Sequence, residues 1–418
     1  MSNGATTNWA GNVTFTPDHI TTPTSIDELA AVVVGARRVR ALGTAHSFSR
    51  VADCDDVLVS VAALPQVVDV DPTSSTARVS AGMRWGEIAP VLHAHGLGVH
   101  TLGSLPHISV AGSVATGTHG SGDGNGCLAT AVVGLELVTA DGSVREIRRG
   151  DPDFAGSVVA LGSVGVVTHV TLACVPAYDV AQTVWEGLRL DVALDGFDAV
   201  MGCAQSVSMF TTWRGDGIEQ VWVKQRVGDP EADLTWTGMT RADGPRHPVP
   251  GADPVHCTQQ GGVHGPWFER VPHFRLDFTP SSGEELQTEY LVPRERAAVA
   301  LRAVDGVRHL VAPVLQVSEI RTVAGDDLWL SPAYGRDSVA IHFTWVADTQ
   351  RVLPVVAAVE EALEPFGPRP HWGKVFTTSP GDVAAAYPRM AEVRRLLDAH
   401  DPGGRFTNDF VSTYVRDA

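Results

Sequence analysis

Cysteine, positive charge and long apolar runs are all scarce in this 418-residue chain. Its five cysteines are scattered and form no C-x-x-C pair, which indicates free thiols in a reducing compartment rather than a disulfide framework or a zinc site. They are Cys54, Cys127, Cys174, Cys203 and Cys257. The formal charge of −17 argues against nucleic-acid and anionic-membrane partners, and it favours a neutral substrate.

Signals for export and membrane insertion are also missing. Residues 1–6 contain neither a basic n-region nor an apolar h-region, and no apolar run approaches the roughly 20 residues that a membrane-spanning helix needs. We therefore expect a cytoplasmic protein. The sequence does not reveal its oligomeric state, and a monomer is the working expectation. Hydrophobic residues at 44% and charged residues at 19% predict a globular chain, too long for one ordinary core.

Local patterns predict an α/β unit over residues 1–175. A capping box at Ser25–Glu28 opens a helix through Gly35, and a second helix is predicted over 85–95, ending at Gly96. The predicted strands are 38–42, 56–62, 66–80, 131–140 and 161–172.

Pro176 marks a change of pattern. From there to Arg369 the strands alternate in the antiparallel manner, with amphipathic helices predicted over 294–304 and 352–363 and a loop over 243–263. Residues 370–418 return to helix and loop. The prediction is an α+β chain in which a second domain, 176–369, is inserted into a discontinuous first domain made of 1–175 and 370–418.

A glycine-rich tract at 112–126 is the first candidate for a ligand site. It holds six glycines with Ser and Thr between them, so its backbone amides and hydroxyls can approach phosphate oxygens closely. The chain lacks the G-x-G-x-x-G dinucleotide fingerprint in the required place. The alternative interpretation is a flexible surface loop, but apolar segments on both sides of the tract favour binding.

His46 is the second candidate, in the glycine-broken loop Gly43–Ser47. One interpretation is an ordinary hydrogen-bonded loop histidine. The other is nucleophilic, because a neutral imidazole nitrogen can attack the 8α-methyl carbon of an isoalloxazine ring and form a histidyl-flavin. Such a bond raises the flavin potential, and for a two-electron couple each ~30 mV is worth about 1.4 kcal/mol. That gain helps with a poor hydride donor such as an unactivated alcohol.

Four motifs together resemble the vanillyl-alcohol-oxidase-type flavoproteins, and within them the sugar and aldonolactone oxidase branch. They are GTAHSF at 43–48, PHISVAG at 106–112, ATGTHGSG at 115–122 and PHWGK at 370–374. The resemblance runs nearly end to end with the motifs in order. It implies a two-subdomain FAD-binding domain, an inserted cap domain built on an antiparallel sheet, and FAD linked covalently through His46. Relatives with a second, cysteinyl bond carry it in the segment matching 100–120, which has no Cys here.

The resemblance also implies which residues contact FAD. They are Ala41, Leu42, Gly43, Thr44, Ala45, His46, Ser47, Ser104, Ser109, Gly112, Thr116, Gly117, Thr118, His119, Val167 and Lys374.

Two cap segments alternate in a way that suits a ligand-facing sheet. In Ile341–Trp345 the odd positions are large and apolar, whereas His342 and Thr344 share the other face. Glu319 and Arg321 likewise point one way. A solvated polar face is the alternative. By resemblance, Glu319, Arg321, His342 and Thr344 line a polyol pocket together with Ser104 and Lys374.

The chemical roles follow from the residue types. Several hydroxyl partners are needed to orient a flexible polyol such as xylitol or sorbitol. Arg321 and Lys374, with His342, are the expected catalytic residues: the two cations stabilise alkoxide charge as hydride leaves C1 for flavin N5. Gly103 precedes Ser104, and its missing side chain leaves room for O2, which predicts an oxidase that forms hydrogen peroxide.

Three other functions were weighed against oxidation of polyols. An aldonolactone oxidase or dehydrogenase shares the same motifs. A metal-dependent hydrolase using His93 and His95 with His100 or His107 is disfavoured, since residues two apart in a helix do not adjoin, and no metal is expected. A flavin-binding protein without turnover would be yellow but would not bleach with polyols.

Overall fold

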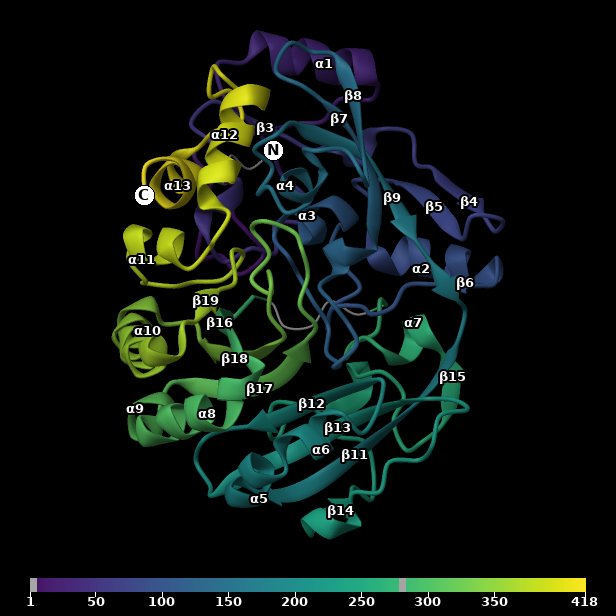
Figure 1. Ribbon diagram of the computed structural model, residues 1–418, viewed down its shortest axis with the longest axis vertical. Coiled ribbons are helices and arrows are strands. Elements are labelled where there is room, and N and C mark those ends of the chain that lie inside the picture. The colour runs from purple at the N-terminus through teal and green to yellow at the C-terminus, as the bar shows by residue number, and fades with distance from the viewer. Residues whose placement is uncertain (1–5, 278–282) are drawn as a thin grey trace.

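The computed structural model describes residues 6–277 and 283–418, and Figure 1 shows two bodies stacked along the long axis. The upper body carries a three-stranded and a five-stranded sheet, and the lower body carries a nine-stranded sheet. The α+β class is confirmed. Residues 1–5, which contain most of the segment examined for a signal peptide, lie outside the described residues.

The three-stranded sheet delivers the His46 loop. Its strands are parallel, in the order β1 (Ile20–Thr21), β3 (Val57–Val59) and β2 (Val39–Ala41). Helix α1 (Ile26–Gly35) begins as predicted, with the Ser25 hydroxyl accepting a hydrogen bond from Glu28 N at 3.2 Å. The Glu28 carboxylate accepts from Thr24 N rather than completing a reciprocal box with Ser25. Leu29 and Val33 of α1 are fully buried, so the helix fixes the sheet beside the loop.

The five-stranded sheet is antiparallel throughout, in the order β4-β5-β9-β7-β8. Its strands are β4 (Val68–Asp71), β5 (Thr76–Ser80), β9 (Val166–Ala173), β7 (Val132–Val138) and β8 (Val144–Arg148). The strand predicted over 161–172 therefore begins too early. Leu161, Gly162 and Gly165 have φ of +53°, +72° and +148°, a conformation that turns the chain and cannot continue a strand.

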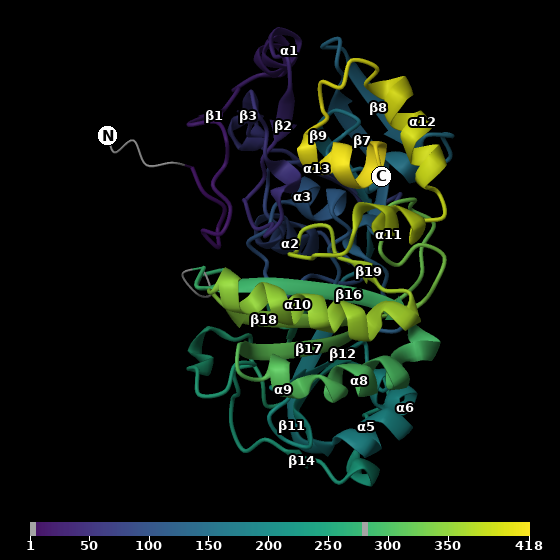
Figure 2. The ribbon, with the colours of Figure 1, turned by 90° about the vertical axis from the view of Figure 1, so that its left-hand side faces the viewer.

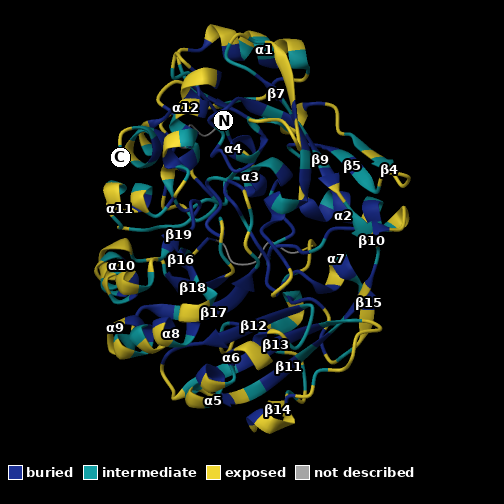
Figure 3. Ribbon diagram, viewed as in Figure 1, coloured by how far each residue is buried: buried dark blue, intermediate teal, exposed yellow. Residues whose placement is uncertain are grey.

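The nine-stranded sheet is also antiparallel, and its order is β14-β11-β13-β12-β17-β18-β16-β19 with β15 beside β11. Its strands are β11 (Asp179–Arg189), β12 (Ser206–Thr211), β13 (Gly217–Arg226), β14 (Thr240–Arg241), β15 (His264–Pro266), β16 (Glu285–Pro293), β17 (Leu315–Val323), β18 (Ser338–Val346) and β19 (Arg369–Pro370). Most of its central strands are buried (Figure 3). The loop predicted over 243–263 contains only a short helical turn at Pro254–His256.

One face of this sheet packs on helices. Apolar residues of α8 (Ala297–Gly306) and α10 (Thr349–Leu363) share a core with Ile341, Phe343 and Trp345 of β18, and Figure 2 shows both helices along the sheet. The Phe343 and Trp345 rings stack at 5.0 Å. The helix predicted from Arg294 starts at Ala297, after a tight turn. Because side chains alternate along a strand, His342 and Thr344 are left on the opposite face, toward the upper body.

The remaining helices are short. They are α2 (Trp85–Ala94), α3 (Val110–Ala115), α4 (Phe154–Val158), α5 (Leu190–Asp195), α6 (Phe197–Met201), α7 (Trp267–Arg270), α9 (Arg308–Val311), α11 (Pro380–Ala385), α12 (Met390–His400) and α13 (Asp409–Val411). None of the helices among the described residues is both long and apolar enough to cross a bilayer.

The C-terminal segment packs back onto the upper body (Figure 2). Val39 N donates to Arg405 O at 2.8 Å, and the Asn408 amide donates to Asp53 O at 2.8 Å. Strand β19 still belongs to the nine-stranded sheet, so the chain leaves the cap near Pro370. We keep 1–175, 176–369 and 370–418 as the proposed domain limits.

Candidate active site

A cavity of about 650 Å³ lies between the upper body and the polar face of the nine-stranded sheet. Segments from both sides line it: the loop after β2, the start and end of α3, the turn at 161–165, strands β16 to β18, and Lys374. Of the residues expected at FAD or substrate, all but one line this cavity. The exception is Gly117, which has a φ of +69° and packs toward Pro332, where a Cβ would meet Pro332 Cδ at 2.9 Å.

Two glycines allow the His46 loop to approach α3 closely. A Cβ at Gly43 would lie 2.3 Å from Ser109 Oγ, and a Cβ at Gly112 would lie 2.7 Å from the same atom. Ser109 N donates to Thr44 Oγ1 at 3.2 Å, which ties the loop to the helix start. A larger residue at either position would therefore force the Ser109 hydroxyl to move. The glycine-rich tract does not form one continuous loop, because its first residues belong to helix α3.

His46 is poised as a neutral imidazole. Ala45 before it has a φ of +56°, an uncommon conformation for a residue with a side chain. The His46 ring stacks on Trp9 with centroids 5.4 Å apart, and its buried Nδ1 has no hydrogen-bond partner among the described residues. Burial lowers the pKa of His46 to about 4. The ring therefore keeps the lone pair that a nucleophile needs.

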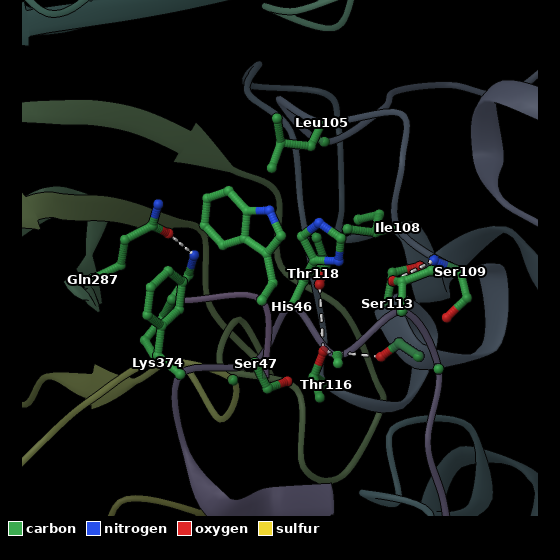
Figure 4. A pocket seen from close by; sticks show the side chains of 18 of the residues that line it. His46, Ser47, Leu105, Ile108, Ser109, Ser113, Thr116, Thr118, Gln287 and Lys374 are labelled. Atoms are coloured by element: carbon green, nitrogen blue, oxygen red, sulfur yellow. Dashed lines mark hydrogen bonds between the residues drawn. The ribbon is translucent and has the colours of Figure 1, made fainter. Parts of the chain in front are cut away.

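These features fit FAD. The walls of the upper half of the cavity offer backbone amides, the hydroxyls of Thr44, Ser109, Thr116 and Thr118, and small residues that leave room for a nucleotide. His46 lines the same cavity (Figure 4), and its buried Nδ1 has no hydrogen-bond partner among the described residues. Among the described residues no group of His, Cys, Asp and Glu could hold a metal ion, so the hydrolase alternative built on His93 and His95 has no site.

Strand register brings the polar cap residues into rows. Glu289 of β16, His342 of β18 and Glu319 of β17 lie opposite one another in three adjacent strands, and Gln287 pairs with Thr344 one row further along. Glu289 and Gln287 were missed from the sequence. The signal was present, because Gln287 and Glu289 alternate with Leu286 and Thr288 just as the predicted pairs alternate on β17 and β18.

Arg321 is held by two carboxylates. Its guanidinium donates to Glu289 Oε1, and its Nε lies 3.7 Å from Glu319 Oε1. Burial is the largest single cause and raises the pKa of each carboxyl, but Arg321 and the neighbouring histidines together outweigh it, so the pKa of both Glu289 and Glu319 lies well below the usual value. Both are therefore ionised hydrogen-bond acceptors.

His273 extends this network on the cap side. Its Nε2 lies 2.8 Å from Glu319 Oε1, and burial lowers its pKa to about 4. Beneath it, the buried Lys224 ammonium donates to the carbonyls of Arg270, Val271 and Pro272 at 2.6–3.0 Å. These three hydrogen bonds hold the segment that carries His273. Sequence reasoning identified neither His273 nor Lys224.

Lys374 reaches the cap sheet from the C-terminal segment. Its Nζ donates to Gln287 Oε1 and lies 5.0 Å from the centre of the Phe48 ring (Figure 4). Burial lowers the pKa of Lys374. The same Gln287 oxygen lies 3.1 Å from His342 Nε2. Burial lowers the pKa of His342 to about 3, so this histidine is neutral at physiological pH.

Comparison with known proteins agrees with this arrangement. Residues 17–148 match a family model described as an FAD binding domain, and residues 283–414 match one described as D-arabinono-1,4-lactone oxidase. The chain is 54% identical to an alditol oxidase from a Streptomyces species over 97% of this chain and 98% of that protein. It is 31% identical to L-gulono-1,4-lactone dehydrogenase from Mycobacterium tuberculosis over 97% of each.

Solved structures share the fold at low sequence identity. A cholesterol oxidase from B. sterolicum superposes with a TM-score of 0.78 at 14% identity, covering 98% of this chain and 96% of that one. A xylooligosaccharide oxidase from Myceliophthora thermophila superposes with a TM-score of 0.77 at 14% identity, covering 99% and 94%.

Fold and site together define an FAD-dependent oxidoreductase with a flavin-binding domain and a cap. The predicted cofactor class is thereby confirmed. The chain belongs to the alditol oxidase family of vanillyl-alcohol-oxidase-type flavoproteins.

Proposed function

We propose that this chain is an FAD-dependent alditol oxidase that takes hydride from the terminal C1 hydroxyl carbon of acyclic polyols such as xylitol and sorbitol, giving the aldose. Bound FAD supplies the hydride acceptor and, on reoxidation by O2, the route to hydrogen peroxide. The observation that carries the proposal is the patterned polar face of the cap sheet. Six side chains at alternate positions of β16, β17 and β18 face one cavity with the flavin-site loop. They are Gln287, Glu289, Glu319, Arg321, His342 and Thr344.

This face is suited to hydroxyl groups rather than to apolar chains. Ionised Glu319 accepts hydrogen bonds, Thr344 and Ser104 donate and accept, and Arg321 only donates. A site built from such groups rejects analogues that lack hydroxyls, because its buried polar groups would then stay unpaired. The acyclic polyol is therefore the preferred substrate class.

The cations suit the reacting end of the substrate. Arg321 is buried and Lys374 is half-buried, and they approach the cavity from different segments. In a site of low dielectric, two fixed donors stabilise the negative charge that develops on the C1 oxygen. Glu289 and Glu319 balance the charge of Arg321, so the site does not bury an unpaired arginine.

The hydrogen bonds of Gln287 define the tautomer of His342. Lys374 can only donate, so the Gln287 atom it contacts is the oxygen, and the Gln287 amide nitrogen donates to Glu285 Oε1. His342 Nε2 must then carry the proton that it shares with the Gln287 oxygen. His342 Nδ1 keeps the lone pair and can accept a hydrogen bond from a substrate hydroxyl.

The covalent link through His46 is part of the proposal, supported by the neutral, buried imidazole with an unpartnered nitrogen. The test is acid precipitation of purified protein. Yellow colour that stays with the polypeptide, and leaves it in His46→Ala, supports the link. Colour released from the unmodified protein would contradict it. A monomer in the cytoplasm remains the expected state.

An aldonolactone oxidase or dehydrogenase is the second candidate, because residues 283–414 match the lactone oxidase model. A substrate panel separates the two. Anaerobic loss of flavin absorbance with xylitol or sorbitol, and not with sugar 1,4-lactones, supports alditol oxidase activity. The reverse result would assign aldonolactone oxidase or dehydrogenase activity instead.

A further inference from the structure

The flavin side of the cavity contains one charged side chain. Among the described residues that line it from the upper body, which are drawn from residues 9–167, Arg40 is the only Asp, Glu, Lys or Arg. The other formal charges at the cavity belong to the cap or to Lys374. Arg40 lies in β2, three residues before the His46 loop (Gly43–Ser47), and only 2% of it is exposed.

The Arg40 guanidinium is bound by neutral groups. Its Nη1 donates to Phe406 O at 2.6 Å, to Gly162 O at 3.1 Å and to Ser163 Oγ at 3.2 Å. Its Nη2 donates to Val51 O at 2.6 Å and to Leu161 O. Its Nε is buried and has no hydrogen-bond partner among the described residues.

No carboxylate in the described part of the chain forms an ion pair with Arg40. The nearby Asp401 carboxylate already accepts hydrogen bonds from Arg405 N and Phe406 N, at 2.7 and 2.8 Å. Burial lowers the pKa of Arg40 to about 10, so it remains charged at neutral pH. A buried charge without a counter-charge is costly, and FAD brings two negative charges on its diphosphate into the same cavity.

We propose that Arg40 is the counter-charge for the cofactor diphosphate and makes this cavity select a dinucleotide over an uncharged flavin. Backbone amides and hydroxyls of the cavity wall would make the direct contacts, whereas Arg40, whose Nη1 and Nη2 already donate to protein groups, would act through its charge. The competing explanation is a purely structural one, because Arg40 joins the turn at 161–163, the segment at Val51 and the C-terminal segment at Phe406. The inference rests on FAD being the cofactor.

The experiment separates charge from structure by comparing two ligands. In the full-length His46→Ala chain, where flavin binds reversibly, dissociation constants are measured for FAD and for riboflavin, which has no phosphate. Arg40→Met should weaken FAD by roughly 10- to 100-fold, as expected for loss of one charged partner, and should change riboflavin by less than about 3-fold. Arg40→Lys keeps the charge and should keep most of the FAD affinity.

Arg405→Met is the matched control. Arg405 also donates to three backbone carbonyls, those of Val33, Val34 and Ala36, but it does not line the cavity. It should leave both dissociation constants unchanged.

Three results would overturn the inference: equal loss of FAD and riboflavin in Arg40→Met, unchanged FAD affinity, or Arg40→Lys as weak as Arg40→Met. If Arg40→Met does not fold, the comparison of Arg40→Lys with the parent, using ADP and adenosine as probes, decides it. ADP affinity kept within about 3-fold in Arg40→Lys supports the inference, and ADP affinity weakened by 10-fold or more contradicts it. A His46→Ala chain that binds neither flavin would overturn the cofactor assignment itself, and this inference with it.

Discussion

Glu289 and Arg321 form a buried ion pair across a strand that lies between them. Glu289 belongs to β16 and Arg321 to β17, whereas β18 runs between the two. The residue of β18 directly opposite Arg321 is Ala340, and its small side chain leaves room for the guanidinium to reach over it. Glu289 also lies 3.3 Å from His119 Nε2 of the flavin-binding side. One carboxylate thus holds a cap residue and touches the other body.

The first prediction concerns this carboxylate as a positioning residue. Glu289→Gln removes the charge that holds Arg321 while keeping the shape, so Arg321 can turn toward Glu319 and away from its place at the cavity. We expect kcat/KM for xylitol to fall by roughly 10- to 100-fold, mostly in kcat, because such a partner is worth about 1.5–3 kcal/mol. Steady-state kinetics on the FAD-loaded enzyme measure it.

The control for this prediction is Glu136→Gln. Glu136 also binds an arginine and a histidine, Arg78 and His169, but it lies in the five-stranded sheet away from the cavity. Its substitution should leave kcat/KM within about 2-fold. Equal effects of the two substitutions would show that Glu289 acts only on stability.

The second prediction concerns the discrimination between hydroxylated and bare chains. Hexan-1-ol has the reacting hydroxyl of sorbitol without the five others, so Glu319, Thr344 and Ser104 stay unpaired when it binds. We expect its kcat/KM to be lower than that of sorbitol by at least about 10³-fold. Glu319→Gln should lower kcat/KM for sorbitol and so reduce the ratio of kcat/KM between sorbitol and hexan-1-ol. Similar efficiency with both alcohols would contradict a pocket for polyols.

The third prediction is acid destabilisation caused by neutral buried histidines. Burial lowers the pKa of His273 to about 4, and that of His342 and His371 to about 3. In the unfolded chain these histidines have their ordinary pKa of 6.5 and take up protons below that pH. In the folded chain they stay neutral until the pH approaches their lowered pKa. Stability is therefore fully present above pH 6.5 and falls as the pH drops toward 4, by up to about 1.4 kcal/mol per histidine for each pH unit.

Thermal unfolding of the enzyme between pH 4 and 7 checks this. His371→Gln should flatten the dependence of Tm on pH, whereas His309→Gln, at an exposed position, should not. Buried carboxylates also contribute to the loss of stability at low pH. The decisive quantity is therefore the difference between variants in the slope of Tm against pH. An unchanged slope in His371→Gln would show that this histidine is not held neutral.

Sequence patterns predicted some parts of the site well for physical reasons that are local. A period of two placed His342 and Thr344 on one face and Phe343 and Trp345 on the other, since alternation is a property of a single strand. The close contact of Gly43 and Gly112 with Ser109 was not predicted; the glycine-rich tract was expected to approach phosphate oxygens, and that expectation stays a prediction. The assignment of roles to these residues rests on resemblance and stays a prediction.

The residues that were missed depend on register and tertiary packing. Nothing in the sequence says that Glu289 lies opposite His342, or that Lys224 sits under His273, because strand pairing and buried cations are set by contacts far apart in the chain. The early start given to the strand at 161–172 has a local cause. Glycine and a left-handed Leu161 turned the chain where apolar residues suggested a strand.

The last prediction concerns access of O2 beside Gly103. A Cβ at this position would make ordinary contacts, 3.5 Å from Thr118 Cγ2 and 3.7 Å from Ile108 Cδ1. Gly103 also lines the cavity beside Ser104, so a Cβ fits there in ordinary contact and a larger side chain would take up space at the cavity wall. We expect Gly103→Val to slow reoxidation of the reduced enzyme by O2 at least about 10-fold while leaving reduction by xylitol within a few fold. Stopped-flow measurement of the two half-reactions tests this, with Gly124→Val as a control at a glycine whose Cβ would meet nothing within 4 Å and which does not line the cavity. If only the reductive half-reaction is slowed, the side chain at position 103 obstructs the polyol and not the access of O2.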